Sequence, residues 1–223
     1  MYLDFIKDDI LINSVLEVYE TLENELEKFR DQKYLTRNSL DPFDFIFKND
    51  KYENWVYHEK LRQIGKTISN KIGNFHETIL GNVYDFKVIN QGHDIQSDKK
   101  KIIADVKNKH NTVKGSDRIG LAKFLQSKID SKFFGYKAYV VEIIPKDKKK
   151  YCEIFSASDR LTGKRIYFKD VYKIDGLSFY ELATGYKNAI YELYKIIPII
   201  LEKEKGLNFS FDILKPFKLS YNI

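Results

Sequence analysis

Gly92-His-Asp-Ile-Gln-Ser-Asp-Lys-Lys-Lys-Ile-Ile-Ala-Asp-Val-Lys-Asn-Lys-His-Asn-Thr112 is the most informative stretch of this 223-residue sequence. Apolar residues at positions 102, 104 and 106 alternate with Ile103, Asp105 and Lys107. Successive side chains of a β-strand point to opposite faces, so this pattern predicts a strand over residues 101–107. Its small apolar side chains would face one way, and Asp105 and Lys107 would share the other face.

The residues just upstream predict a second strand that pairs with the first. Residues 93–96 precede Ser97-Asp-Lys-Lys100, which is rich in residues that favour turns, so the two segments are expected to form an antiparallel hairpin. Directly opposed residues of such a pair project to the same face. Ten residues, an even number, lie between Asp94 and Asp105, so an unbulged pairing puts Asp94 on the face of Asp105 and Lys107.

Two carboxylates and a lysine on one face predict metal-dependent chemistry on a phosphodiester. Neighbouring carboxylates repel unless a proton or a cation lies between them, and hard oxygen ligands with positions open to water suit Mg²⁺. Asp94 and Asp105 are the predicted ligands, with the Val106 carbonyl as a third, and Lys107 would orient the attacking water or neutralise developing charge. An Asp-x-Lys tripeptide alone is also typical of a solvated strand edge, but the upstream acid and the polar segment 108–112 favour the site.

Several segments resemble a known family. Asp94 with Asp105-Val-Lys107 resembles the PD-(D/E)xK nuclease signature, and Asp105-Val-Lys-Asn-Lys-His-Asn-Thr112 resembles the Glu-x-Lys-Asn-Lys-His-Asn-Thr block of Type II restriction endonucleases that cut GGNCC or GGWCC sites. The resemblance runs from about residue 72 to 200, and further segments that carry it are Gly73-Asn-Phe-His-Glu-Thr-Ile-Leu80, Gly92-His-Asp-Ile95, Val141-Glu-Ile-Ile144 and Phe179-Tyr-Glu-Leu-Ala-Thr-Gly185. This chain has Asp105 where the group usually has Glu, His93 where Trp is common, and no Pro before Asp94.

The resemblance implies a Mg²⁺-dependent Type II restriction endonuclease, a hydrolase that cuts duplex DNA at a short, near-palindromic, GGNCC-like site. It implies a restriction-endonuclease-like α/β fold, with a mixed sheet of about four to six strands flanked by helices. A near-palindrome suits a two-fold homodimer, and a restriction-modification system would supply a DNA methyltransferase as genetic partner.

The same resemblance suggests further site residues. Nucleases of this kind often receive an extra acid from the helix before the first strand, and Glu77 is the candidate, with a surface glutamate as the alternative. The polar residues after the Asp-x-Lys tripeptide are candidates for contacts with bases or phosphates: Lys109, His110, Asn111 and Thr112. His76 is expected to be a buried hydrogen-bonding residue rather than a metal ligand.

Composition sets the remaining limits. With 43% apolar residues the chain is expected to form one nuclease domain over 1–223, whose portion 1–70 is mainly helical. Its net charge of +6 favours a polyanionic partner without requiring one. Cys152 is the only cysteine, which excludes an intrachain disulfide and fits a reducing cytoplasm. The most apolar run, 196–201, is six residues long and contains Pro198, so neither export nor membrane insertion is expected.

Periodicity predicts the other elements. Helices are expected over 12–31, 42–47, 116–131 and 178–205, the last with a break at Gly185 and a kink at Pro198. Residues 52–80 are expected to form one helix, or two that divide near Gly65 or Gly73. Strands are expected over 86–89, 93–96, 101–107, 136–144, 151–155 and 165–172, of which 136–144 reads as a central strand buried on both faces.

Capping and terminal residues add detail. Asp41 before a proline and Ser178 are the predicted helix caps. Glu142 is expected to pair with a lysine, and residues 209–221 to pack across the body or a partner subunit.

Two rival functions stay open on these residues. One is a PD-(D/E)xK repair or junction nuclease without sequence specificity, which would use the same metal-binding residues. The other is a catalytically silent DNA-binding module of the same fold, for which the Asp at position 105 is the only support. Plasmid digestion separates them, since only a site-specific enzyme yields defined fragments.

Overall fold

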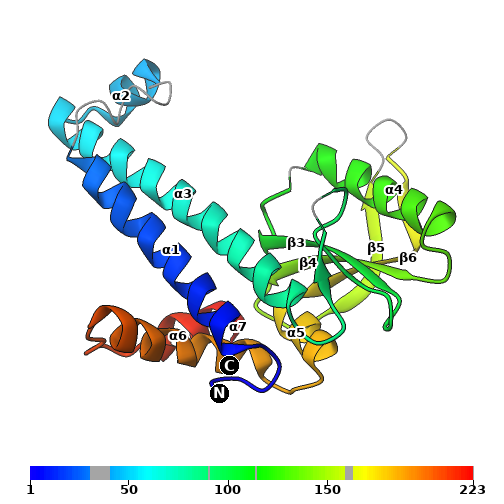
Figure 1. The fold of residues 1–223 in the computed structure, drawn as a ribbon. Coiled ribbons are helices and arrows are strands. Elements are labelled where there is room, and N and C mark those ends of the chain that lie inside the picture. The colour runs from blue at the N-terminus through cyan, green and yellow to red at the C-terminus, as the bar shows by residue number, and fades with distance from the viewer. Residues whose placement is uncertain (31–40, 90, 114, 159–162, 223) are drawn as a thin grey trace.

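The computed structural model describes residues 1–30, 41–89, 91–113, 115–158 and 163–222, without the side chains of residues 115 and 116. Among these residues, three helices make up the first third of the chain; three strands, one helix, three further strands and three C-terminal helices follow (Figure 1). The elements are α1 Asp8–Phe29, α2 Pro42–Lys48, α3 Tyr52–Gly81, β1 Lys87–Val88, β2 Ile95–Ser97, β3 Ile102–Lys109, α4 Gly115–Ser131, β4 Lys137–Ile144, β5 Cys152–Ser158, β6 Arg165–Asp175, α5 Gly176–Thr184, α6 Ala189–Lys205 and α7 Leu214–Tyr221.

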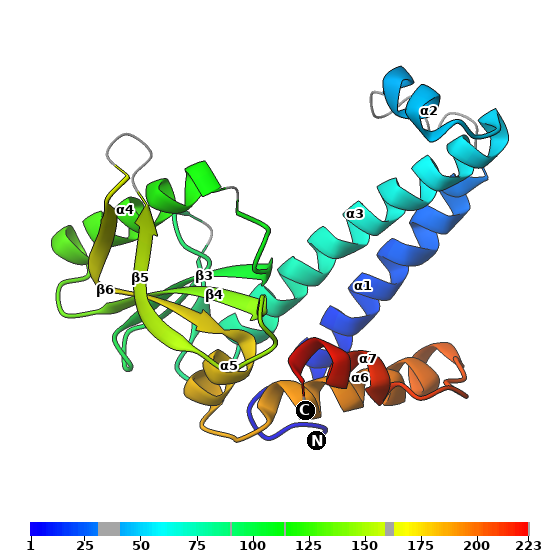
Figure 2. The same cartoon turned by 180° about the vertical axis from the view of Figure 1, so that it is seen from behind.

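The sheet is mixed. In the described residues it has six strands in the order β1-β2-β3-β4-β6-β5, with parallel pairing of β3 with β4 and of β4 with β6. The β1-β2-β3 segment and the β5-β6 hairpin are antiparallel, and the hairpin extends on the side of the sheet away from α3 (Figure 2). This architecture confirms the predicted α/β class and the predicted central position of residues 136–144.

Each face of the sheet has its own core, as the alternation in β3 predicts. The apolar residues of β3 at positions 102, 104 and 106 belong to the larger core, which α1, α3, α5, α6 and α7 complete. Ile103, on the opposite face, packs with Leu125 and Ile129 of α4. The predicted active-site face of β3 is therefore the face that α4 covers.

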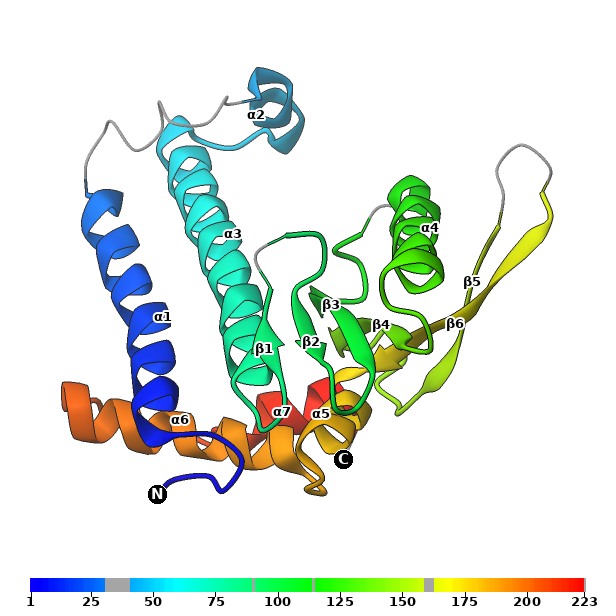
Figure 3. The same cartoon turned by 45° about the vertical axis from the view of Figure 1, so that its right-hand side comes forward.

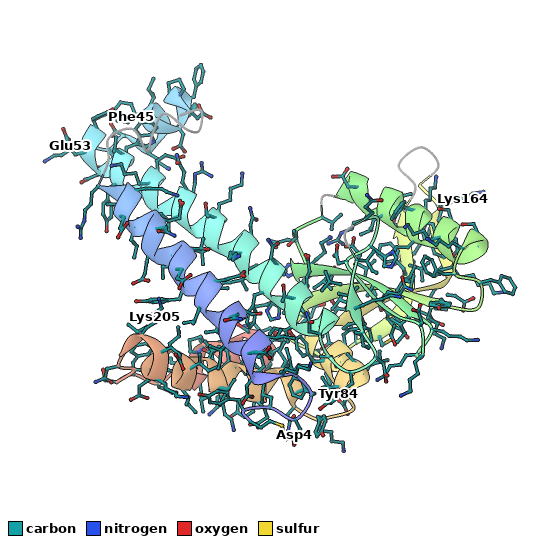
Figure 4. The ribbon with its side chains drawn as sticks, viewed as in Figure 1. Asp4, Phe45, Glu53, Tyr84, Lys164 and Lys205 are labelled. Carbon is teal, nitrogen blue, oxygen red and sulfur yellow. The ribbon has the colours of Figure 1, made fainter. Side chains whose placement is uncertain are left out.

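The N-terminal helices form an arm. α1 and α3 run side by side away from the sheet, and α2 lies at the far end of α3 (Figures 1 and 3). Lys205 of α6 pairs with Glu20 of α1 at 3.2 Å, and Tyr84 donates a hydrogen bond to the Asp4 carbonyl at 2.6 Å, so α6 is tied to the middle of α1 and the N-terminal segment to the residues just after α3 (Figure 4). No helix among the described residues is long and apolar enough to cross a bilayer.

Several predicted boundaries agree with the structure. Asp41 caps α2 by accepting hydrogen bonds from the backbone N–H groups of Phe43 and Asp44. Gly185 ends α5 in a left-handed conformation, as the predicted break requires, and the last residues pack onto the body through Phe217 and Tyr221. The predicted end of the first helix at residue 31 lies outside the described residues. The assignment of 1–223 to one nuclease domain stays a prediction.

The structure decides between one helix and two over residues 52–80, and it corrects one predicted cap. α3 is continuous over Tyr52–Gly81, without a break at Gly65 or Gly73. A glycine costs a helix only about 1 kcal/mol, which the packing of the long apolar face outweighs. Ser178 is not a cap: α5 begins at Gly176, and the Asp175 side chain accepts the hydrogen bond of the Ser178 N–H. A Cβ at Gly176 would clash with the Ile143 carbonyl, so glycine is required there.

Candidate active site

The β2-β3 hairpin brings Asp94 and Asp105 together. Ile95 pairs with Ala104 and Ser97 with Ile102, so the turn occupies residues 98–101, one position later than predicted. Asp94 lies just before β2, and its N–H donates to the Ala104 carbonyl at 3.0 Å, one residue off the register of the paired strands. The predicted sharing of a face by Asp94 and Asp105 is retained, because the Lys107 ammonium lies near both carboxylates.

The Asp94 carboxylate is fixed against β3. Its Oδ2 accepts a hydrogen bond from the Val106 N–H at 2.7 Å and lies 3.8 Å from the Lys107 Nζ. The same Nζ lies 2.5 Å from the Oδ1 of Asp105. The predicted convergence of two carboxylates and one lysine is thus present in the fold, with the lysine between the acids.

Glu77 reaches the same group from α3. Burial, followed by the charge of Asp94, raises the pKa of the half-buried Glu77 to about 7, against the opposing effect of Lys107. The charges of Asp94, Lys107 and Asp105 all act on Glu77, so the candidate helix acid lies within electrostatic range of the hairpin acids.

Crowding of negative charge perturbs the other ionisable groups too. Burial and the charge of Asp94 raise the pKa of Asp105 to about 6, although Lys107 opposes the shift. Burial alone would lower the pKa of Lys107, but the charges of Asp105, Asp94 and Glu77 raise it. The lysine is therefore protonated at neutral pH, and its single positive charge does not balance the three acids around it.

The acids fit a divalent cation, although no three side chains of His, Cys, Asp or Glu form a ready-made metal site in the part of the chain that the structure describes. The Oδ1 of Asp105 is buried and accepts no hydrogen bond from the described residues, with the Lys107 ammonium as its cationic neighbour. The N–H and C=O of one strand residue point to the same side, so the Val106 carbonyl points to the side from which Asp94 approaches. Two carboxylates and a carbonyl could thus share one cation.

The predicted DNA-contacting residues form the turn after β3. The Lys109 carbonyl accepts from the Thr112 N–H at 3.0 Å, and the Thr112 hydroxyl accepts from the Lys109 N–H at 3.3 Å. The His110 N–H donates to the Ile144 carbonyl at 3.1 Å, and Arg118 of α4 donates to the His110 carbonyl at 2.5 Å. Lys109, Asn111 and Thr112 are exposed, so their side chains are accessible beside the acids.

Two residues of the motifs that resemble the restriction endonucleases have structural roles. Asn108 is buried, and its amide donates to the Ser69 carbonyl of α3 at 3.0 Å, which ties the catalytic strand to the arm. His76 Nδ1 lies 2.8 Å from the Tyr180 hydroxyl, and burial lowers the pKa of the imidazole to about 4. His76 is therefore neutral and hydrogen-bonded, as predicted.

Among the described residues Glu142 pairs with no lysine, contrary to the prediction. It accepts a short hydrogen bond from the Tyr151 hydroxyl and lies 3.9 Å from Arg118. Basic residues of β6 also come close to the active-site face, because the register pairs Lys173 with Val140 of β4. No local pattern signals these contacts, since they depend on pairing between distant strands.

Comparison with known proteins agrees with this geometry. A sequence model of the Eco47II restriction endonuclease family matches residues 3–204. The Type II restriction enzyme Eco47II of Escherichia coli is 36% identical over 211 residues, which cover 90% of this chain and 87% of the relative. The Type II restriction enzyme Sau96I of Staphylococcus aureus is 31% identical over 211 residues, 90% of this chain and 80% of the relative. No solved structure gives a significant match.

Proposed function

The chain belongs to the Eco47II restriction endonuclease family, and we propose that it is a Type II restriction endonuclease that hydrolyses duplex DNA at a short, near-palindromic, GGNCC-like site. The observation that carries the proposal is Lys107 held between Asp94 and Asp105, at 3.8 Å and 2.5 Å. The GGNCC-like specificity rests on the resemblance of residues 105–112 to the block quoted above.

In this proposal Mg²⁺ is the metal, and Asp94, Asp105 and the Val106 carbonyl hold it. A divalent cation stabilises charge on the phosphoryl group and makes a water more acidic. The fixed Asp94 carboxylate supports the assignment, because a ligand held by the Val106 N–H needs little rearrangement to bind. The buried Oδ1 of Asp105 supports it as well.

Lys107 and Glu77 handle protons and charge. Lys107, protonated and directed at the acids, orients the attacking water or neutralises the charge that develops at phosphorus during in-line displacement. Glu77, whose pKa is about 7, accepts a proton or orients the water, since a base with a pKa near the working pH is efficient.

DNA recognition and assembly complete the proposal. Lys109, His110, Asn111 and Thr112 lie at and just after the end of β3 and are candidates for contacts with bases or phosphates, and the side chains of all but His110 are exposed. A two-fold homodimer would match a near-palindrome half-site by half-site. A DNA methyltransferase encoded nearby would protect the host DNA, and the enzyme would work in the cytoplasm, where that DNA lies.

Digestion of a sequenced plasmid tests this function. The purified protein is incubated with and without Mg²⁺, and the cut ends are mapped by sequencing. Defined fragments whose ends share a GGNCC-like sequence are expected only with the metal. Random fragments would instead favour the nuclease without sequence specificity, and binding without any cleavage in Mg²⁺ or Mn²⁺ would favour the silent DNA-binding module.

A further inference from the structure

A second, basic cavity adjoins the active site. Its volume is about 120 Å³, and Lys107 lines it together with four other cations and one acid: Lys109, Arg118, Arg165, Lys173 and Glu142. Lys107 therefore borders both the acidic site and this cavity. The two features lie on the same face of the sheet, next to each other.

Long-range pairing assembles the cavity. Lys107 of β3 stands opposite Glu142 of β4, and Lys173 of β6 stands opposite Val140 of β4. Arg165 at the start of β6 donates from its Nε to the Ser156 hydroxyl of β5 at 2.8 Å, so its guanidinium is held by a side chain that also lines the cavity. Strands β3, β4, β5 and β6 all contribute.

Positive charge exceeds negative charge in this cavity. Glu142, the acid in its wall, already accepts from the Tyr151 hydroxyl and faces Arg118 at 3.9 Å. Lys173 pairs at 3.0 Å with Glu153, which is 61% exposed, so solvent weakens that pair. Lys109 and Arg165 form no ion pair with another residue in the described ranges. The cavity therefore has charge left for an anion.

We propose that this cavity binds a backbone phosphate of DNA next to the phosphate that is cleaved. Arginine and lysine donors around a small cavity suit phosphate oxygens. With one phosphate held by Arg165 and Lys173, the neighbouring phosphate is positioned at Lys107 and the acids. These two cations are positioning residues, and the inference rests on the proposed function.

Salt dependence of DNA binding tests the cavity. Binding of a 30-base-pair duplex containing a GGNCC sequence is measured by fluorescence anisotropy with Ca²⁺ in place of Mg²⁺. The slope of log Kd against log salt concentration is expected to fall in magnitude by about one for Arg165→Gln and by about two for the double variant with Lys173→Gln. Lys218→Gln, an exposed lysine of α7, is the charge-matched control and should keep the wild-type slope.

A methylphosphonate scan then identifies the phosphate. Replacing one phosphate at a time by the neutral linkage should reveal a position that weakens wild-type binding but leaves binding by the double variant unchanged. The proposal is overturned if the double variant, folded by its thermal melt, keeps the wild-type slope or responds to every linkage as the wild type does. Defined plasmid fragments would then still uphold the proposed function, whereas altered slopes without cleavage would uphold the cavity alone.

Discussion

Glu77→Gln is expected to change how the stability of the protein depends on pH. In the folded protein Glu77 keeps its proton up to about pH 7, whereas an unperturbed glutamate releases it near 4.5. Its contribution to stability is therefore fully present below pH 4.5 and is lost as the pH rises to 7. A glutamine is neutral throughout, so the variant does not undergo this loss.

The expected magnitude follows from the pKa values. A shift from 4.5 to about 7 corresponds to up to roughly 3 kcal/mol, at about 1.4 kcal/mol per unit. Because Glu77 is only half-buried, solvent screening reduces this figure, and between pH 5 and pH 8 the variant should gain roughly 1 to 2 kcal/mol over the wild type. For a chain of this length the gain amounts to about 2 to 8 °C in Tm. Burial is the first cause of the shift and the Asp94 charge the second.

Thermal melts of both proteins without metal, at half-unit intervals from pH 5 to pH 8, measure the effect. Because the comparison is between two pH values, any constant loss of packing in the variant cancels. Glu53→Gln removes an exposed acid at the far end of the same helix and serves as the control (Figure 4). Parallel curves of Tm against pH for wild type and Glu77→Gln would refute the reasoning.

Metal binding and the anchor of β3 lead to two further expectations. Mg²⁺ should raise Tm more at pH 8 than at pH 5.5, because at the lower pH protons on Glu77 and Asp105 compete with the cation. An equal rise in Tm at both pH values would exclude these acids as its binding site. Asn108→Ala should cost about 1 to 2 kcal/mol in urea unfolding, since it removes the hydrogen bond to the Ser69 carbonyl, while the exposed Asn111→Ala should cost nothing measurable. A stable Asn108→Ala protein would show that this contact does not tie β3 to the arm.

Local patterns predict the catalytic hairpin well. Alternation in residues 102–107 depends only on the geometry of one strand, and both cores confirm it. The turn lies one residue later than predicted, yet Asp94 and Asp105 still meet at Lys107, because a four-residue loop is kept. Side-chain faces depend on parity and not on the loop's position, so the error has no effect on the site.

Contacts between distant segments could not be predicted. Glu142 of β4 lies near Arg118 of α4, the helix that connects the parallel strands β3 and β4. Lys173 reaches the site only through the pairing of β4 with β6. The cap of α5 has a similar explanation. Asp175 ends a strand and also accepts from the Tyr151 N–H at 2.7 Å, a contact that favours it over Ser178 but is invisible in local sequence.

The cleavage rates of two single variants test whether Asp105 and Lys107 carry out the reaction. Asp105→Asn and Lys107→Met remove the proposed metal ligand and the lysine while keeping side chains of similar size. Single-turnover cleavage of the mapped site with Mg²⁺ is compared with duplex binding in Ca²⁺. Both variants are expected to bind the duplex still, and each to cut at least about a hundredfold more slowly than the wild type. Cleavage by both variants at the wild-type rate and at the same sites would show that Asp105 and Lys107 are not the catalytic residues.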